Sequence, residues 1–157
     1  MIDIEQPDVA IQCSPSTDRV PTFDWVRTFP DGLDKVTTPA FVYDEGILLQ
    51  LLDQAQPIRK DGLCRLLFAI KSFSFAEALR VMAPRLDGFA VSSLYEARLA
   101  RGIVSPGGSI HITTPGLRDN EVEDIGSLCD FLSFNSLNQW DMFRDRIKDG
   151  TSCGIRI

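Results

Sequence analysis

The chain has 157 residues, of which 44% are hydrophobic and 24% charged, and its formal net charge is −6. The length suggests one globular domain, and the acidic balance argues against a nucleic-acid partner because nucleic-acid-binding surfaces are basic. No stretch is apolar enough to span a membrane, and the early acidic residues of the N-terminal segment do not predict a secretory signal. The four cysteines have no metal-ligand spacing. We therefore predict a cytoplasmic protein with reduced thiols, without a metal site or a membrane partner.

The first elements come after a long irregular segment. Residues 1–36 are rich in Pro, Asp, Ser and Thr and show no sustained period, which predicts a mobile N-terminal tail. The stretch "TPAFVYDE", residues 38–45, predicts a short strand. Residues 45–60 predict a helix whose apolar side is made by leucines, and Gly62 fits its end.

Five apolar, strand-like runs follow, beginning near residues 66, 88, 109, 130 and 153, with helical stretches between them. Strands that alternate with helices predict βαβ units and a parallel sheet, hence an α/β fold. The even spacing favours part of a (β/α)₈ TIM-type barrel, and a doubly wound sheet of five strands is the alternative. Five units fit where a barrel needs eight, so residues 37–157 are predicted to be the truncated N-terminal part of a longer barrel.

Polar residues stand where these strands end, and ligands of parallel α/β folds gather at the carboxyl ends of strands. Lys71 follows the run "LLFAI", which reads as a strand buried on both faces. The candidates at the other strand ends are Ser93, Glu96, Thr114, Asn135, Ser136 and Arg156. The alternative is that the Ser, Thr and Asn residues only cap the helices that follow, and that Lys71 is a solvated loop lysine.

A half-buried lysine at a strand end suggests chemistry with an aldehyde. Partial burial would lower the pKa of Lys71, and a neutral amine condenses with carbonyl compounds. Pyridoxal 5'-phosphate is the cofactor held in this way. Glu96 and Arg156 are the carboxylate and the cation available to order its ring and charged groups. His111, the only histidine, needs no role in this scheme.

The segment "LLFAIKSFSF" resembles the lysine strand of the fold-type III pyridoxal-phosphate enzymes, the alanine racemase and ornithine decarboxylase group. Within that group, "LDGFAVSSLYEARLAR", "IHITTPG", "FLSFNSLNQW" and "GIRI" are similar, in order and spacing, to segments of the carboxynorspermidine decarboxylase family. The resemblance covers roughly residues 22–157. It implies the N-terminal barrel domain seen in alanine racemase, with pyridoxal 5'-phosphate as cofactor.

The resemblance also implies roles for individual residues. Lys71 matches the family's Schiff-base lysine, and Glu96 matches a glutamate near the cofactor. Arg156 matches an arginine that faces the mouth of the cofactor site. Asn135 and Ser136 match a polar pair that lines the site. The implied reaction is the decarboxylation of carboxynorspermidine or carboxyspermidine to norspermidine or spermidine, by an enzyme that forms homodimers.

Two departures from the family pattern qualify this expectation. Ala90 stands where the ornithine decarboxylase branch has an aspartate, which favours the carboxynorspermidine branch. The family's stacking histidine, phosphate loop and ring-nitrogen carboxylate lie beyond the fifth strand, so we expect the chain alone to be inactive and a complementing C-terminal chain to be possible. The alternatives are a diaminopimelate decarboxylase, an amino-acid racemase, and a non-catalytic remnant or interaction module.

Overall fold

The computed structural model describes residues 36–60, 62 and 64–156. The tail predicted over residues 1–36 thus lies, except for its last residue, outside the described residues. The chain divides into two compact units between Gln54 and Ala55. Among the helices of the described residues, none combines the length and the apolar character needed to cross a bilayer.

The described part of the first unit is an irregular segment followed by a helix. The strand predicted over residues 38–45 is wrong, because residues 38–44 have no strand structure. Phe41 is fully exposed and Val42 is exposed, and among the described residues of the unit no strand lies beside these apolar side chains. The helix α1 spans Glu45–Lys60 as predicted. Asp44 begins it by accepting a hydrogen bond from the Ile47 N–H at 3.0 Å, the usual role of an N-cap aspartate.

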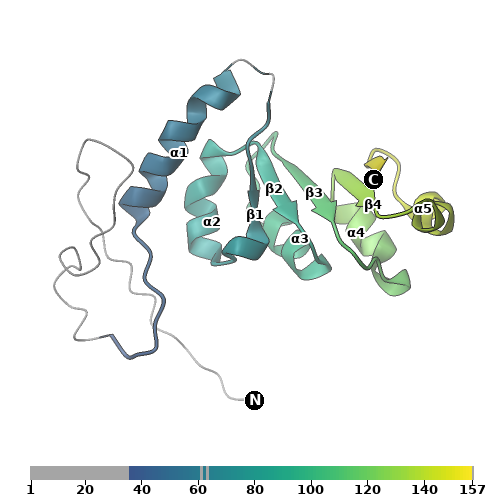
Figure 1. The fold of residues 1–157 in the computed structure, drawn as a ribbon, viewed down its shortest axis with the longest axis horizontal. Helices are drawn as coiled ribbons and strands as arrows, with labels where there is room; N and C mark the ends of the chain where they lie inside the picture. Colours follow the sequence, from purple (N-terminus) through teal and green to yellow (C-terminus); the bar gives the residue numbers. More distant parts are fainter. Residues whose placement is uncertain (1–35, 61, 63, 157) are drawn as a thin grey trace. The chain divides into compact units, whose positions relative to one another are not determined.

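The second unit contains one parallel sheet (Figure 1). Its strands are β1 (Leu67–Ala69), β2 (Gly88–Val91), β3 (Ser109–Thr113), β4 (Phe131–Phe134) and β5 (Ser152–Ile155). Its α-helices, after the last residues of α1, are α2 (Ala76–Met82), α3 (Leu94–Arg101), α4 (Val122–Leu128) and α5 (Leu137–Phe143). The strands lie in the order β1-β2-β3-β4-β5. A doubly wound sheet reverses its strand order at a switch point, whereas a barrel adds each strand beside the last, so the predicted barrel-type α/β fold is confirmed.

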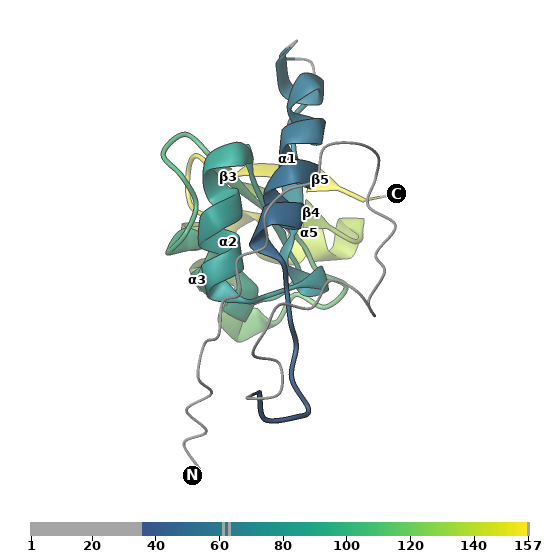
Figure 2. The same ribbon diagram turned by 90° about the vertical axis from the view of Figure 1, so that its left-hand side faces the viewer.

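The core lies between the sheet and its helices. In the three central strands the apolar residues of one face are buried, for example Val91, Ile112 and Leu132, which occupy matching register positions in neighbouring strands. Figure 2 shows α2 and α3 side by side on the same side of the sheet. Residues of the other face, such as Ala90 and His111, are only half-buried. The sheet is thus covered by helices on one face, as in a barrel wall.

The first strand differs from its prediction. The run "LLFAI" was predicted to be buried on both faces, but Leu67–Ala69 is half-buried throughout. Among the described residues β1 is at the edge of the sheet, where β2 is its one hydrogen-bonded neighbour. Ile70, the next residue, is completely buried and anchors the end of the strand.

Candidate functional site

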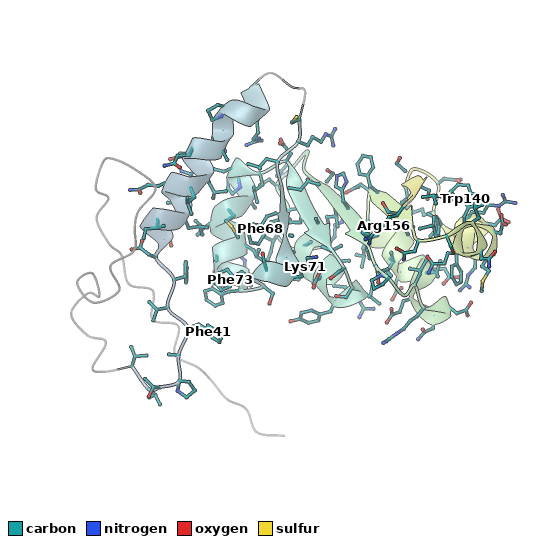
Figure 3. All side chains as sticks on the ribbon, viewed as in Figure 1. Phe41, Phe68, Lys71, Phe73, Trp140 and Arg156 are labelled. Atoms are coloured by element: carbon teal, nitrogen blue, oxygen red, sulfur yellow. The ribbon has the colours of Figure 1, made fainter. Side chains whose placement is uncertain are left out.

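Lys71 lies at the carboxyl end of β1, on a single 3₁₀ turn that spans Ile70–Ser72 (Figure 3). The turn is closed by a backbone hydrogen bond from the Phe73 N–H to the Ile70 carbonyl at 3.0 Å. The Ser72 hydroxyl donates to the Ala69 carbonyl at 2.6 Å. The chain therefore turns one residue earlier than predicted, and the buried Ile70 side chain fixes where the lysine emerges.

The environment of Lys71 is open. Its side chain is exposed, so the partial burial predicted for it is wrong in this structure. Burial at a strand end requires something above the strand, and a strand sequence does not reveal what that is. Among the described residues, Lys71 has no hydrogen-bond or ion-pair partner. The turn that carries it lies against β2 and α3, so the amine is accessible beside the next βα unit.

Ser93 and Glu96 build the turn between β2 and α3. The Ser93 hydroxyl accepts a hydrogen bond from the Glu96 N–H at 3.2 Å and caps the helix. The Glu96 carboxylate in return accepts from the Ser92 N–H at 2.7 Å and from the Ser92 hydroxyl at 3.0 Å. A carboxylate in the first turn also interacts favourably with the helix dipole. Both residues therefore have a structural role here, which the cap alternative anticipated for Ser93.

The same turn occurs again between β4 and α5. The Ser136 hydroxyl accepts from the Gln139 N–H at 3.2 Å and caps α5. The Gln139 side-chain oxygen accepts from the Asn135 N–H at 3.0 Å, in the way that Glu96 accepts from Ser92. The Asn135 side-chain amide also donates to the Thr114 carbonyl, so the ends of β3 and β4 are tied together. Thr114 itself donates only a long bond, of 3.4 Å, to the Gly116 carbonyl.

Arg156 follows the last strand. Its backbone N–H donates to the Phe134 carbonyl at 2.7 Å, which fixes its position beside the end of β4. The guanidinium is exposed (Figure 3), and it has no partner among the described residues. Lys71 and Arg156 follow the two outermost strands, with three strands between them. The structure therefore brings Thr114, Asn135 and Ser136 together at one place and leaves the two free cations at opposite strands.

Two residues of these turns were missed by the reasoning from sequence. Ser92 and Gln139 make the hydrogen bonds that close the two turns. The signal was available, because a serine followed three residues later by Glu or Gln is the pattern of a capping box. "SLYE" and "SLNQ" both carry it.

Cys129, which follows α4, and Cys153, on β5, are not activated nucleophiles. Burial raises the pKa of the Cys129 thiol to about 12 and also raises the pKa of Cys153. Because the thiolate is the reactive form, neither is activated. Among residues 36–60, 62 and 64–156, no group of His, Cys, Asp or Glu side chains is arranged to hold a metal ion.

Comparisons with known proteins identify relatives. No family model matches the chain. It is 28% identical over 123 residues to the carboxynorspermidine/carboxyspermidine decarboxylase of Campylobacter jejuni, covering 78% of this chain and 31% of that protein. The corresponding enzyme of Herminiimonas arsenicoxydans is 29% identical over 127 residues (75% and 34%). The carboxyaminopropylagmatine decarboxylase of Synechocystis is 30% identical over 126 residues (80% and 32%).

A solved structure agrees with these relatives. The crystal structure of carboxynorspermidine decarboxylase from Campylobacter jejuni in complex with norspermidine superposes with a TM-score of 0.69 and 28% identity. The resemblance to the carboxynorspermidine decarboxylases is confirmed. The match covers 76% of this chain and 32% of the chain in the crystal. The chain thus spans about a third of the length of the decarboxylases that it matches.

Proposed function

We propose that this chain forms the lysine-bearing part of a pyridoxal-phosphate-dependent decarboxylase that acts on a carboxylated polyamine. The observation that carries the proposal is Lys71, an exposed amine at the carboxyl end of β1 that has no partner among the described residues. It stands in a chain whose sequence and fold match carboxynorspermidine decarboxylases. The carboxyl ends of parallel strands are where α/β folds bind their ligands.

The described residues fit the cofactor in part. Lys71 is an accessible amine, which is what attachment of an aldehyde requires. Arg156 is an exposed cation without a partner in the described structure, suited to an anionic group of the cofactor or the substrate. Glu96 places a negative charge at the start of α3, which disfavours a phosphate there. When bound, pyridoxal 5'-phosphate supplies an electron sink for the carbanion left by the loss of carbon dioxide.

The substrate class follows from the relatives. The enzymes from Campylobacter jejuni and Herminiimonas arsenicoxydans are named for carboxynorspermidine and carboxyspermidine, and the one from Synechocystis for carboxyaminopropylagmatine. All of these names describe decarboxylation of a carboxylated polyamine, which favours this reaction over amino-acid racemisation or diaminopimelate decarboxylation. We propose conversion of carboxynorspermidine or carboxyspermidine to norspermidine or spermidine. The net charge of −6 suits a polycationic substrate, because the field of an acidic protein attracts cations.

The complete site needs more than the described residues. No described residue at the carboxyl edge of the sheet is assigned to the phosphate or to the ring nitrogen of the cofactor. The proposal is therefore that this chain alone has little activity. The remaining groups come from further sequence of the same protein, from a second subunit of a homodimer, or from a complementing C-terminal chain.

The experiment that tests the proposal is reductive labelling of the purified chain. The chain is incubated with pyridoxal 5'-phosphate and reduced with borohydride, and the modified peptides are mapped by mass spectrometry. We expect label at Lys71, close to one per chain, and its loss in Lys71→Arg. Lys148 is an exposed lysine that precedes β5 and does not follow the carboxyl end of a strand, so Lys148→Arg is the matched control and should leave the labelling unchanged.

The contrary result is label scattered over the lysines at similar levels and unchanged in Lys71→Arg. That outcome would mean that the chain has the fold of a decarboxylase part without a working lysine. A positive result leads to a second measurement. Carboxynorspermidine is added to the unreduced chain in the presence of pyridoxal 5'-phosphate, and the release of norspermidine is followed.

A further inference from the structure

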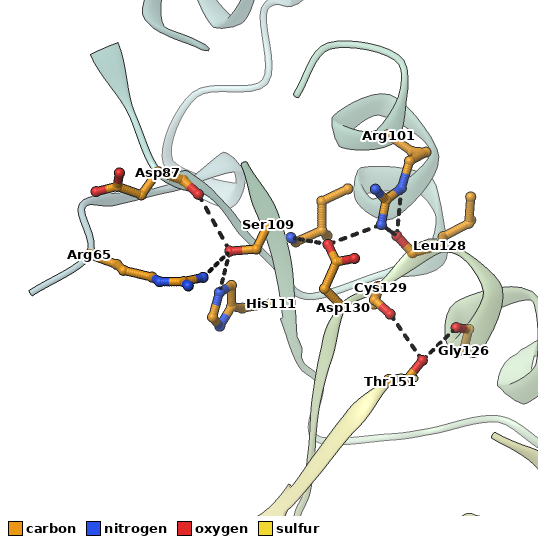
Figure 4. Close-up of polar contacts among 11 residues, drawn as sticks. Arg65, Asp87, Arg101, Ser109, His111, Gly126, Leu128, Cys129, Asp130 and Thr151 are labelled. Carbon is orange, nitrogen blue, oxygen red and sulfur yellow. Dashed lines mark hydrogen bonds and ion pairs between the residues drawn. The ribbon is translucent and has the colours of Figure 1, made fainter. Parts of the chain in front are cut away.

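A network of polar groups joins three strands near their amino ends, away from Lys71 (Figure 4). Arg65 precedes β1, and its guanidinium lies 3.4 Å from the Ser109 hydroxyl. Ser109 begins β3, and its hydroxyl lies 2.8 Å from Nε2 of His111 on the same strand. The same hydroxyl lies 3.4 Å from the carbonyl oxygen of Asp87, which precedes β2. One buried hydroxyl therefore has three partners from three elements.

The imidazole of His111 is held firmly in this position. Its ring stacks on the Phe131 ring of β4, with 4.2 Å between the centroids and 9° between the planes. It is half-buried. Burial lowers the pKa of His111, the positive charge of Arg65 lowers it further, and the negative charge of Asp130 opposes both effects. Burial and Arg65 therefore both favour the neutral imidazole in the folded chain.

When the hydrogen of the neutral imidazole is on Nδ1, each bond in the network has a definite direction. A guanidinium can only donate, so the Ser109 oxygen accepts from Arg65. The serine has one proton of its own, and its nearest acceptor is Nε2 of a neutral His111 at 2.8 Å, with the Asp87 carbonyl farther away at 3.4 Å. In this state every donor in the network faces an acceptor.

Protonation of His111 breaks this arrangement. Nε2 then carries a hydrogen and must donate, so two cations, the imidazolium and the guanidinium of Arg65, converge on the same Ser109 oxygen. Within the network, the distant Asp87 carbonyl is then the only acceptor left for the serine proton. The imidazole is stacked and half-buried, whereas Arg65 is exposed. Arg65 is therefore the partner that leaves, because water solvates it at little cost.

We propose that Arg65, Ser109 and His111 form a proton-sensitive latch, in which protonation of His111 releases Arg65 from the sheet. The effect is local, because the start of β1 keeps a second attachment. The Asp87 carboxylate accepts from the Leu66 N–H at 2.7 Å and is paired with Arg59 at 2.8 Å. The latch loosens one side chain at the base of the strand whose other end carries Lys71. The inference is independent of the proposed decarboxylase function.

The experiment uses the fact that His111 is the only histidine of the chain. Its carbon-bound imidazole protons therefore give one titration curve by NMR. Arg65→Gln should raise the measured pKa of His111, because it removes a positive charge that disfavours the imidazolium. Arg118 is an exposed arginine paired with Glu121, and Arg118→Gln is the control that should leave the curve unchanged.

A second readout follows the latch itself. The side-chain N–H signal of Arg65, assigned by its loss in Arg65→Gln, should shift at the same pH at which His111 titrates. In His111→Gln, which keeps an acceptor but cannot be protonated, this shift should be absent. The proposal is overturned if the pKa of His111 is the same with and without Arg65, or if the Arg65 signal shifts equally in His111→Gln.

Discussion

Replacing Gly88 with alanine tests how closely β2 and β3 approach each other. Gly88 begins β2 and has a φ of +148°, in the region that favours glycine. A Cβ atom built there lies 1.8 Å from the carbonyl oxygen of Ser109, and 2.7 Å and 2.8 Å from its carbonyl carbon and nitrogen. All three atoms are backbone, so no side-chain rotation relieves the contact. The strands must separate at the point where the Ser109 N–H donates to the Asp87 carbonyl at 2.9 Å.

The free-energy cost of Gly88→Ala has two parts, one from the backbone conformation and one from the separation of the strands. The backbone conformation alone costs an alanine about 1–3 kcal/mol. Separation of the strands adds lost ladder hydrogen bonds at about 1 kcal/mol each and lost packing of the neighbouring Phe89, which is completely buried. We expect Gly88→Ala to lose about 4 kcal/mol or more of its free energy of unfolding. Domains of this size have only about 5–15 kcal/mol in total, so the variant should be largely unfolded at moderate temperature.

Two other glycines separate these parts. Gly107 has a φ of +83° with nothing within 4 Å of a built Cβ, and Gly116 has the same open space without a positive φ. Urea unfolding followed by circular dichroism should therefore give a graded series. Gly116→Ala stays within about 0.5 kcal/mol of the parent, Gly107→Ala loses about 1 kcal/mol or slightly more, and Gly88→Ala loses most. The reasoning fails if Gly88→Ala unfolds at the same urea concentration as Gly107→Ala.

Three further predictions concern caps, thiols and acid stability. Ser93→Ala and Ser136→Ala should each lower the free energy of unfolding by about 1 kcal/mol, measured by urea unfolding, whereas equal stability to the parent would deny the caps. Iodoacetamide at pH 8 should alkylate the exposed Cys64 in the native chain and Cys129 only after unfolding, since burial raises the Cys129 pKa to about 12. Burial raises the pKa of Asp87, but hydrogen bonds from its arginine partner and a backbone N–H, with the nearby positive charges, outweigh burial and lower it overall. Its stabilising contribution is thus complete above about pH 4, the unfolded value, and is lost as the pH falls through the folded value. Asp87→Asn should flatten the acid side of the stability curve, and an unchanged acid side would contradict this.

The sheet was predictable from sequence because its helix-facing side is built from apolar residues at every strand. Val91, Ile112 and Leu132 stand at matching register positions, and each belongs to a run that is apolar in the sequence. The even spacing of these runs then predicted the order of the strands. This information is local, because each strand pairs with the strand of the preceding βα unit.

Exposure at the chain's edges was not predictable in the same way. The segment at residues 38–45 has the composition of a strand, but Phe41 remains exposed and the segment forms no strand. Lys71 was predicted to be half-buried and is exposed. In both cases the prediction depended on a neighbour in space, and strand propensity contains no information about whether that neighbour exists.

The two segments that most resemble the decarboxylases also show why resemblance and chemistry need separate tests. "SSLYE" and "NSLNQ" form the same turn with matching hydrogen bonds, one closed by Glu96 and the other by Gln139. Since a neutral oxygen closes the second turn, the turn requires an acceptor and not a charge. Similarity at these segments therefore reflects the turn that joins a strand to the next helix, and any chain of this fold needs such a turn. Lys71 makes no contribution of that kind, because its amine has no partner in the described structure. The case for decarboxylation consequently depends on the reactivity of this one amine far more than on the longer matching segments.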